Sequence, residues 1–226
     1  HNLSVSGAAK NMPYRVSVGY TDQNGILKNT DMQRTTASLS LDPTFFKKDL
    51  KVSINVKGMH TNQNYGETGA IGSAINMDPT QVVKDNGVMY DGYYQWANYG
   101  ASLGTPNPVE QLMAADNKSV VQRVIANAQF NYKFRFLPDL KANLNLATDY
   151  AKSDGHNNRP ITSPGVITNP YWGKINDYTG KNYNNLLDFY LNYVKEFGDR
   201  KSASMAAGLV IRSPAITTKP AAIEEN

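Results

Sequence analysis

The sequence predicts an all-β fold of about eight antiparallel, up-and-down strands, with short turns at one end and long loops at the other, as in a membrane β-barrel. Three observations predict it. Apolar and polar residues alternate along several segments, short and long connections alternate between those segments, and 14 Tyr stand beside 7 Phe and 2 Trp. Successive side chains of a strand point to opposite faces, so the alternation indicates one apolar and one wet face.

The clearest predicted strand covers residues 124–136, where every even position is apolar or aromatic. Ile125 is the one apolar residue at an odd position. After the turn at 137–139 the same phase resumes over residues 140–146, so the two segments predict a hairpin. The other predicted strands, in chain order, lie near residues 3–5, 14–20, 36–41, 50–57, 187–193 and, more weakly, after Lys201.

The connections between these strands differ in length in a regular order. Short connections are predicted at residues 10–12, 43–49, 137–139 and 198–201, and long ones at residues 21–31, 58–120 and 151–181. An up-and-down sheet then carries all its long loops at one end, as outer-membrane barrels do. A tilted membrane strand needs about 9–11 residues, which segments 124–136 and 140–150 reach.

A soluble all-β sandwich or lectin-like barrel would show the same alternation, with its polar face in solvent. The long loops at 58–120 and 151–181 are awkward for a compact soluble domain, since structureless loops beyond about 12–15 residues are uncommon there. The alternative that stays open is a free-standing soluble β-domain with glycan-binding or hydrolase activity.

Composition argues against several other classes of protein. The chain contains no cysteine, which excludes disulfides and thiolate metal sites. It has no apolar run long enough for a helical span. The net charge of +4 is dispersed, so no nucleic-acid partner is expected. The histidines His1, His60 and His156 are far apart and no G-x-S-x-G motif occurs, so we expect no catalytic residues, no enzyme, no metal site and no cofactor.

The longest predicted loop contains the best candidate for a binding site. Aromatic residues there are interleaved with Asp91 and Asn98, and they are Tyr90, Tyr93, Tyr94, Trp96 and Tyr99. Tyr171 and Trp172 form a second candidate pair in the next long loop. Flat amphipathic rings beside hydrogen-bonding side chains suit a sugar or peptide ligand. The alternative is that the rings pack the loops against each other or against a partner.

Several motifs, in the same order, resemble one known family. They are YRVSVGYTDQNGILKNTD at 14–31, LDPTFF at 41–46, TGAIG at 68–72, MDPTQ at 77–81, GTPNP at 104–108, and NAQFNY with FLPDLKANLNL at 127–146. The stretch from residue 1 to about residue 200 resembles the barrel region of SusC/RagA-type TonB-linked outer-membrane transporters.

The resemblance implies a barrel of about 22 strands with an N-terminal plug in the bacterial outer membrane, surrounded by lipid. It also implies a SusD-like surface lipoprotein as partner, TonB as the source of energy, and oligosaccharides or peptides as cargo. This chain would then be a fragment that forms barrel wall and extracellular loops.

The end of the chain departs from this pattern. Residues 202–226 contain no Phe, Tyr or Trp, although residues 1–201 are rich in them. We therefore divide the chain into a partial barrel segment at 1–201 and an atypical tail at 202–226, which we expect to be either disordered or non-native in origin.

Overall fold

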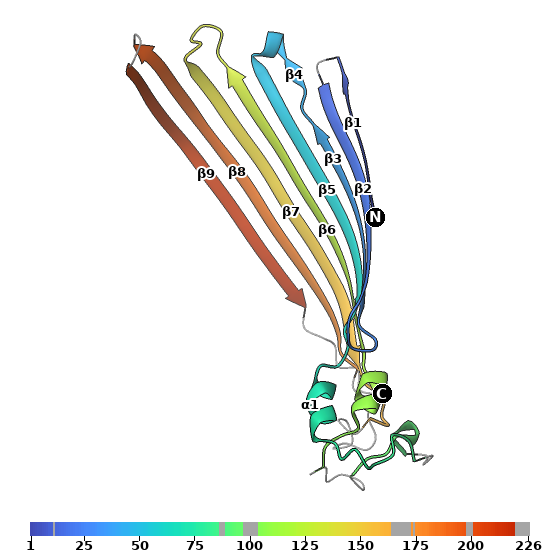
Figure 1. Cartoon of the computed structure of the whole chain (residues 1–226). Coiled ribbons are helices and arrows are strands. Elements are labelled where there is room, and N and C mark those ends of the chain that lie inside the picture. The colour runs from blue at the N-terminus through green and yellow to red at the C-terminus, as the bar shows by residue number, and fades with distance from the viewer. Residues whose placement is uncertain are drawn as a thin grey trace.

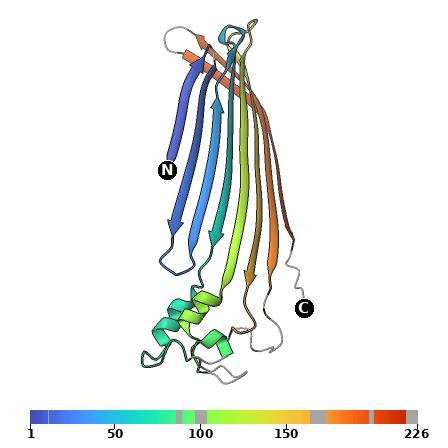
Figure 2. The ribbon, with the colours of Figure 1, turned by 90° about the vertical axis from the view of Figure 1, so that its right-hand side faces the viewer.

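The computed structural model describes residues 1–10, 12–85, 89–96, 104–163, 173, 175–197 and 201–219. These residues form one long, twisted antiparallel sheet with most of its short helices gathered at one end (Figures 1 and 2). The strands are β1 (Asn2–Ala9), β2 (Met12–Asn24), β3 (Asp31–Leu41), β4 (Thr44–Phe45), β5 (Leu50–Asn64), β6 (Asp116–Lys133), β7 (Leu140–Asn158), β8 (Asp177–Phe197) and β9 (Lys201–Lys219). The helical elements are η1 (Phe46–Lys48), α1 (Gly69–Asn76), η2 (Met89–Gly92) and α2 (Pro108–Ala114).

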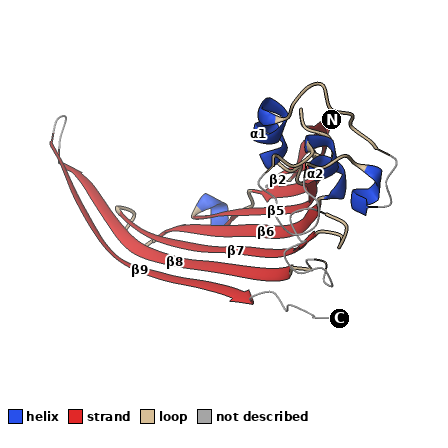
Figure 3. Ribbon diagram, turned by 90° about the horizontal axis from the view of Figure 1, so that it is seen from below, coloured by secondary structure: helices blue, strands red, loops and turns tan. Residues whose placement is uncertain are grey.

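The strand order follows the chain order. Neighbours in the sheet run β1-β2-β3-β5-β6-β7-β8-β9, and the short β4 pairs with the start of β5. The longer links, 25–30, 65–115 and 159–176, connect the strands at the end that carries α1 and α2, which we call the loop end (Figure 3). Links such as 134–139 lie at the opposite, turn end. The predicted up-and-down arrangement of strands is therefore confirmed.

Residues in register across the sheet point to the same face, which gives the sheet one apolar face. One such row consists of Leu41, Ile54, Ala128, Leu146, Leu187 and Ile211. At the turn end this face carries the rings of Tyr132 and Phe134, whose centroids are 5.0 Å apart. Toward the loop end it carries Tyr150 and Tyr183, whose centroids are 4.8 Å apart. A pair of aromatic rings therefore lies toward each end of the apolar face, in the part of the sheet formed by β6 to β8.

The other face is polar and is linked by side chains between strands. Ser17 and Ser38 join β2 to β3 by a hydrogen bond of 2.6 Å between their hydroxyls. Asn127 Nδ2 donates to Asn145 Oδ1 across β6 and β7 at 2.5 Å. Such polar pairs between strands suit a face that meets water.

The strands continue toward the loop end beyond the residues whose alternation predicted them. β5 runs on through 58–64, β7 through 151–158, and β8 begins at 177, all in stretches predicted as loops. Backbone pairing persists there, for example between Asn62 and Val120. Most side chains in these extensions are polar on both faces, so no period-two contrast marks them in the sequence.

The predicted tail overlaps the last strand of the sheet. β9 pairs along its whole length with β8, from Phe197 opposite Lys201 to Thr179 opposite Lys219. Small residues occupy much of it, and Gly208 lies opposite Tyr190. Residues 220–226 lie outside the described residues, and the non-native origin expected for the tail stays a prediction.

The sheet is a single layer with very little interior. Among the described residues, the buried apolar side chains are those of Val52, Ala70 and Tyr90. Large apolar side chains such as Leu3, Val18 and Leu209 are exposed instead. A patch of this extent needs a cover, because soluble proteins seldom leave large contiguous apolar areas in water. None of the described helices is long and apolar enough to cross a membrane.

Candidate functional site in the loop region

The aromatic segment at 89–96 has an unusual backbone. Tyr90, Asp91 and Gly92 follow one another with φ values of 52°, 53° and 76°. Non-glycine residues seldom adopt this left-handed conformation, and such residues persist only where their surroundings hold them. Tyr93 then forms an isolated bridge with Lys84, supported by a hydrogen bond from Tyr94 N to Val83 O at 3.2 Å.

Asn107 fastens this segment to the beginning of α2. Its side chain is 2% exposed, and its Nδ2 donates to Val83 O at 2.9 Å and to Tyr94 O at 3.1 Å. Its Oδ1 accepts from Val109 N at 3.0 Å and Glu110 N at 3.3 Å, so it is also the N-cap of α2. One amide side chain therefore uses both its donors and its acceptor to join two parts of the loop.

The predicted aromatic residues take different places in this arrangement. Tyr90 is buried, at 7% exposed, and thus packs within the loop. Tyr93 lies partly exposed beneath Lys84, whose Nζ is 4.6 Å from the ring centroid. Tyr94 and Trp96 meet edge to face at 5.8 Å, and Trp96 is 46% exposed. Among the described aromatic residues of this segment, the exposed ring surface therefore comes from Tyr93, Tyr94 and Trp96.

Trp96 packs close to a glycine. A Cβ added to Gly104 would lie 2.5 Å from Trp96 Cβ and 3.1 Å from its Cγ. Only a residue without a side chain leaves room for the indole at this place. Tyr99, Tyr171 and Trp172, the other residues predicted to contact a ligand, lie outside the described residues.

Contacts from two other links, 25–30 and 159–176, hold the loop region against the end of the sheet. Arg159 and Glu67 form an ion pair. Thr162 Oγ1 donates to Asp91 Oδ2 at 2.9 Å, and Asn29 Nδ2 donates to Leu112 O at 2.9 Å. The aromatic segment is therefore tied to link 159–176, and α2 is tied to link 25–30.

A carboxyl group lies buried beside the aromatic segment. Glu110 of α2 is 2% exposed. Its burial raises the pKa of the carboxyl above the ordinary range, and the nearby Ser163 hydroxyl and Arg159 guanidinium offset part of that effect. The protonated form of Glu110 is therefore favoured more strongly in the folded loop than in water.

Sequence reasoning missed Asn107 and Glu110. The signal for Asn107 was present, because an Asn followed by Pro at the first helical position is a common helix start. Nothing local marks Glu110 as buried, since α2 acquires its cover from segments distant in the sequence. Among the described residues, no group of three or more His, Asp or Glu is placed to hold a metal ion.

No family model matches the chain. It is 36% identical over 224 residues to the TonB-dependent receptor SusC of Bacteroides thetaiotaomicron, a match that covers 92% of this chain and 22% of that protein. It is 24% identical over 216 residues to the TonB-dependent receptor P39 of Formosa agariphila, covering 93% of this chain and 19% of that one. The chain therefore spans about a fifth of the length of these curated relatives.

Solved structures share the fold. The RagAB peptide importer in its open-open state matches with a TM-score of 0.70 at 16% identity, covering 95% of this chain and 25% of that chain. The closed-closed state of the same importer matches with a TM-score of 0.66 over 96% of this chain. The sheet is thus the same in form as part of a TonB-dependent barrel. The order of motifs, the identity to SusC and the fold agree, and the chain belongs to the SusC/RagA-type family of TonB-dependent receptors, as a segment of its barrel.

Proposed function

We propose that this chain forms part of the wall and external loops of a TonB-dependent transporter in the bacterial outer membrane, which imports oligosaccharides or peptides. The observation that carries the proposal is the apolar face, which has an aromatic pair toward each end, on a sheet whose large loops all lie at one end. Lipid would cover that face, and the polar face would line the water-filled interior of the barrel.

The height of the apolar face fits a membrane. From Leu140 to Tyr150 the strand β7 advances roughly ten residues, which is about 34 Å at 3.4 Å per residue. A strand tilted by about 40° projects that length onto roughly 26 Å of membrane, close to the apolar band of about 25 Å in outer-membrane barrels. The loop end, with Tyr93, Tyr94 and Trp96, would lie outside the cell.

The relatives support a proposal for the cargo, the partner and the energy source of the parent protein. Its relatives are named TonB-dependent receptors, and the RagAB relative is described as a peptide importer. We therefore assign to the parent protein TonB coupling, a SusD-like lipoprotein partner, and either oligosaccharides or peptides as cargo. A transporter needs no catalytic residues, and the free-standing soluble β-domain is not favoured by these relatives.

Cysteine labelling tests the wall, because this chain contains no cysteine of its own. Single cysteines at Ala126 and Ala128 would lie on the apolar face, and those at Asn127 and Gln129 on the polar face. In the full-length receptor in native membranes, we expect a charged maleimide to label the second pair and spare the first until detergent unfolds the protein. Equal labelling of both pairs, or recovery of the receptor in the soluble fraction, would overturn the proposal.

Substitution of the exposed rings tests the cargo site. We expect Trp96→Ala and Tyr94→Ala each to weaken uptake of the cognate oligosaccharide or peptide about fivefold in apparent affinity, since each ring contributes on the order of 1 kcal/mol. Phe136→Ala is the matched control, because Phe136 is an exposed ring at the turn end. Equal uptake by all three variants would exclude these rings from cargo binding.

A further inference from the structure

Two adjacent strands repeat the same order of side-chain chemistry on the apolar face. From the loop end toward the turn end, β7 carries Lys152, Tyr150, Thr148 and Leu146. In register beside them, β8 carries Lys181, Tyr183, Asn185 and Leu187. Each strand therefore passes from a cation to a phenol, then to a hydrogen-bonding group, and then to an aliphatic side chain. A membrane lipid changes in the same order, from its charged head through its carbonyl linkages to its acyl chains.

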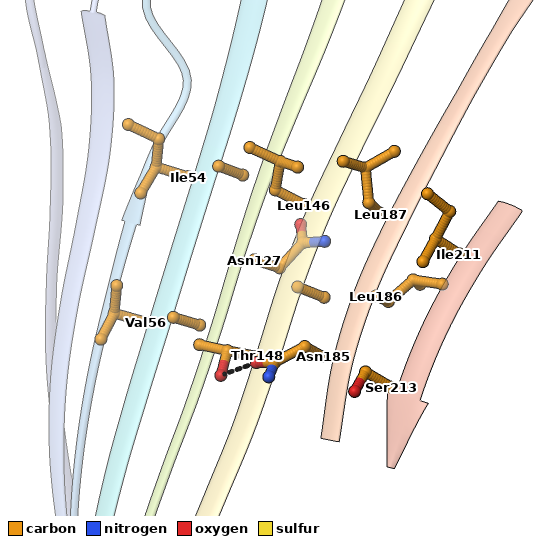
Figure 4. A pocket seen from close by; sticks show the side chains of 13 residues that line it. Ile54, Val56, Asn127, Leu146, Thr148, Asn185, Leu186, Leu187, Ile211 and Ser213 are labelled. Atoms are coloured by element: carbon orange, nitrogen blue, oxygen red, sulfur yellow. Dashed lines mark hydrogen bonds between the residues drawn. The ribbon is translucent and has the colours of Figure 1, made fainter. Parts of the chain in front are cut away.

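The aliphatic end of this column opens onto a groove of about 440 Å³ (Figure 4). Ile54 and Val56 stand on one side of it, and Leu146, Leu187 and Ile211 on the other. The strand between them, β6, contributes Ala126 and Ala128 to this face, and their short side chains leave the space free. The groove is therefore a depression in the apolar face that is wide enough for a flexible hydrocarbon chain.

The hydrogen-bonding pair of this column, Thr148 and Asn185, lies at one end of the groove. Thr148 Oγ1 donates to Asn185 Oδ1 at 2.8 Å, and Figure 4 shows the pair with Ser213 next to it. No hydrogen bond from the Asn185 amide nitrogen to another described residue accompanies this one. An amide N–H without a partner in apolar surroundings is unfavourable in free energy. An oxygen acceptor supplied from outside the chain, such as an ester or amide carbonyl, would remove that cost.

The cationic end of the column consists of Lys152 and Lys181, which lie directly opposite each other in the β7–β8 ladder. Like charges at such positions repel. Lys152 Nζ is 2.6 Å from Asp154 Oδ2, which neutralises one of the two charges. Lys181 forms no ion pair with a described residue, but the Asp154 carboxylate also attracts it. The two lysines and this one carboxylate therefore leave one net positive charge just beyond the Tyr150 and Tyr183 rings. A phosphate at this level would face both ammonium groups.

We propose that the apolar face of β7 and β8 is a binding site for one phosphorylated, net anionic acyl lipid of the loop-side leaflet. Lys181, with Lys152, binds the phosphate, the Asn185 amide donates to a carbonyl of the linkage, and an acyl chain lies in the groove over Ala126 and Ala128. The inference rests on the proposed function, because it needs the apolar face to lie in a membrane.

Lipid retention tests this site in the full-length receptor purified in detergent. The receptor is mixed with phosphatidylglycerol or with phosphatidylcholine, and retained lipid is counted by native mass spectrometry. We expect retention of phosphatidylglycerol over phosphatidylcholine. Lys181→Ala should weaken retention about fivefold, because one cation near a lipid surface contributes about 1 kcal/mol. Ala128→Leu should lower retention of both lipids by filling the groove.

Lys57→Ala is the control for charge, since Lys57 is an exposed lysine on the polar face of β5 and should not affect retention. Asn185→Leu distinguishes a specific lipid site from nonspecific binding of lipid to an apolar surface. It makes the face more apolar, yet it should reduce phosphatidylglycerol retention. Equal retention of the two lipids, or equal losses with Lys181→Ala and Lys57→Ala, would overturn the proposal. If the same receptor shows the expected cysteine labelling pattern in native membranes, such a result refutes the lipid site alone.

Discussion

Arg123 and Asp149 form a bidentate ion pair between β6 and β7 on the polar face of the sheet. Arg123 Nε donates to Asp149 Oδ1 at 2.8 Å, and its Nη2 donates to Oδ2 at 2.5 Å. The two side chains are 42% and 26% exposed, so water screens the pair substantially. Its planar, two-bond geometry nevertheless fixes the relative positions of the strands more firmly than a single contact would.

The first prediction concerns this pair. We expect Arg123→Ala and Asp149→Asn each to lower the free energy of unfolding, with a coupling energy of about 0.5–1 kcal/mol between them, because exposed ion pairs contribute little beyond that. Urea unfolding of the refolded receptor in liposomes, for both single variants and the double variant, gives the coupling directly. The coupling should shrink at high salt, and a coupling that is zero at low salt would contradict the prediction.

The second prediction concerns Gly155, which lies opposite Tyr178 in the β7–β8 ladder. The Tyr178 ring covers the glycine, and an added Cβ would also come within 2.7 Å of Lys118 O. Gly155→Ala should therefore lower the free energy of unfolding by about 1–3 kcal/mol, the usual cost of overpacking. Thermal unfolding in detergent, followed by the gel shift between folded and unfolded barrel, provides the measurement.

Gly180→Ala is the matched control, because Gly180 lies on β8 and nothing is within 4 Å of an added Cβ there. That substitution should be neutral or should stabilise the strand by about 0.5–1 kcal/mol. Equal destabilisation by both substitutions would mean that loss of glycine itself, and not the contact with Tyr178, is responsible.

The third prediction concerns the two roles of Asn107. Asn107→Asp keeps the oxygen that caps α2 but removes the donors to Val83 O and Tyr94 O. Asn107→Ala removes both, and loss of the cap alone costs about 1 kcal/mol. We would measure backbone amide hydrogen exchange in the full-length receptor. The Asn107→Asp variant should lose protection at residues 83–96 while α2 stays protected, whereas the Asn107→Ala variant should lose protection in both. Protection of residues 83–96 in the Asp variant would show that the amide donors are dispensable.

The fourth prediction concerns pH and Glu110. Because the folded loop raises the pKa of this carboxyl, the folded state holds its proton at pH values where the unfolded state has lost it. Loop stability should therefore fall as pH rises from the ordinary glutamate range through the raised pKa, and stay low above it. Hydrogen exchange of residues 104–114, corrected for the intrinsic rate, should show greater opening at neutral pH than at acidic pH.

Glu110→Gln should abolish this dependence and protect the loop at neutral pH. Asp78→Asn is the control, because hydrogen bonds from the Thr80 backbone N–H and hydroxyl lower the pKa of Asp78. Its contribution is lost only as pH falls through that lowered value, so the Asp78 substitution should leave the profile above about pH 5 unchanged. A steep profile that persists in Glu110→Gln would assign the effect to another group.

The sequence predicts the part of the fold in which the two faces of the sheet differ. Residues 124–136 alternate because one face is apolar there, and β6 is found where the alternation predicts it. The extensions 58–64 and 151–158 escape prediction because most of their side chains are polar on both faces. In β9, small residues such as Gly208 weaken the contrast, so only pairing with β8 reveals most of the strand.

The loop site follows the same logic. Aromatic composition alone directed attention to the segment around Tyr94 and Trp96, which the structure places partly at the surface. The same composition could not separate these rings from the buried Tyr90, because burial depends on how segments distant in the sequence come together. Long-range contacts of this kind leave no local pattern.

The strand order has a consequence for how such a wall is assembled. Each strand from β1 to β9 docks on its predecessor in the chain, apart from the short β4, so the sheet can grow hairpin by hairpin without threading one segment past another. Each doubling of the length of a connection adds only about 0.6 kcal/mol to the entropic cost of closing it. Replacing a link as long as 25–30 by one as long as 65–115 therefore raises the entropic free-energy cost of docking the next strand by only about 2 kcal/mol. Loops on the loop end can thus lengthen and diversify while the order of insertion stays the same.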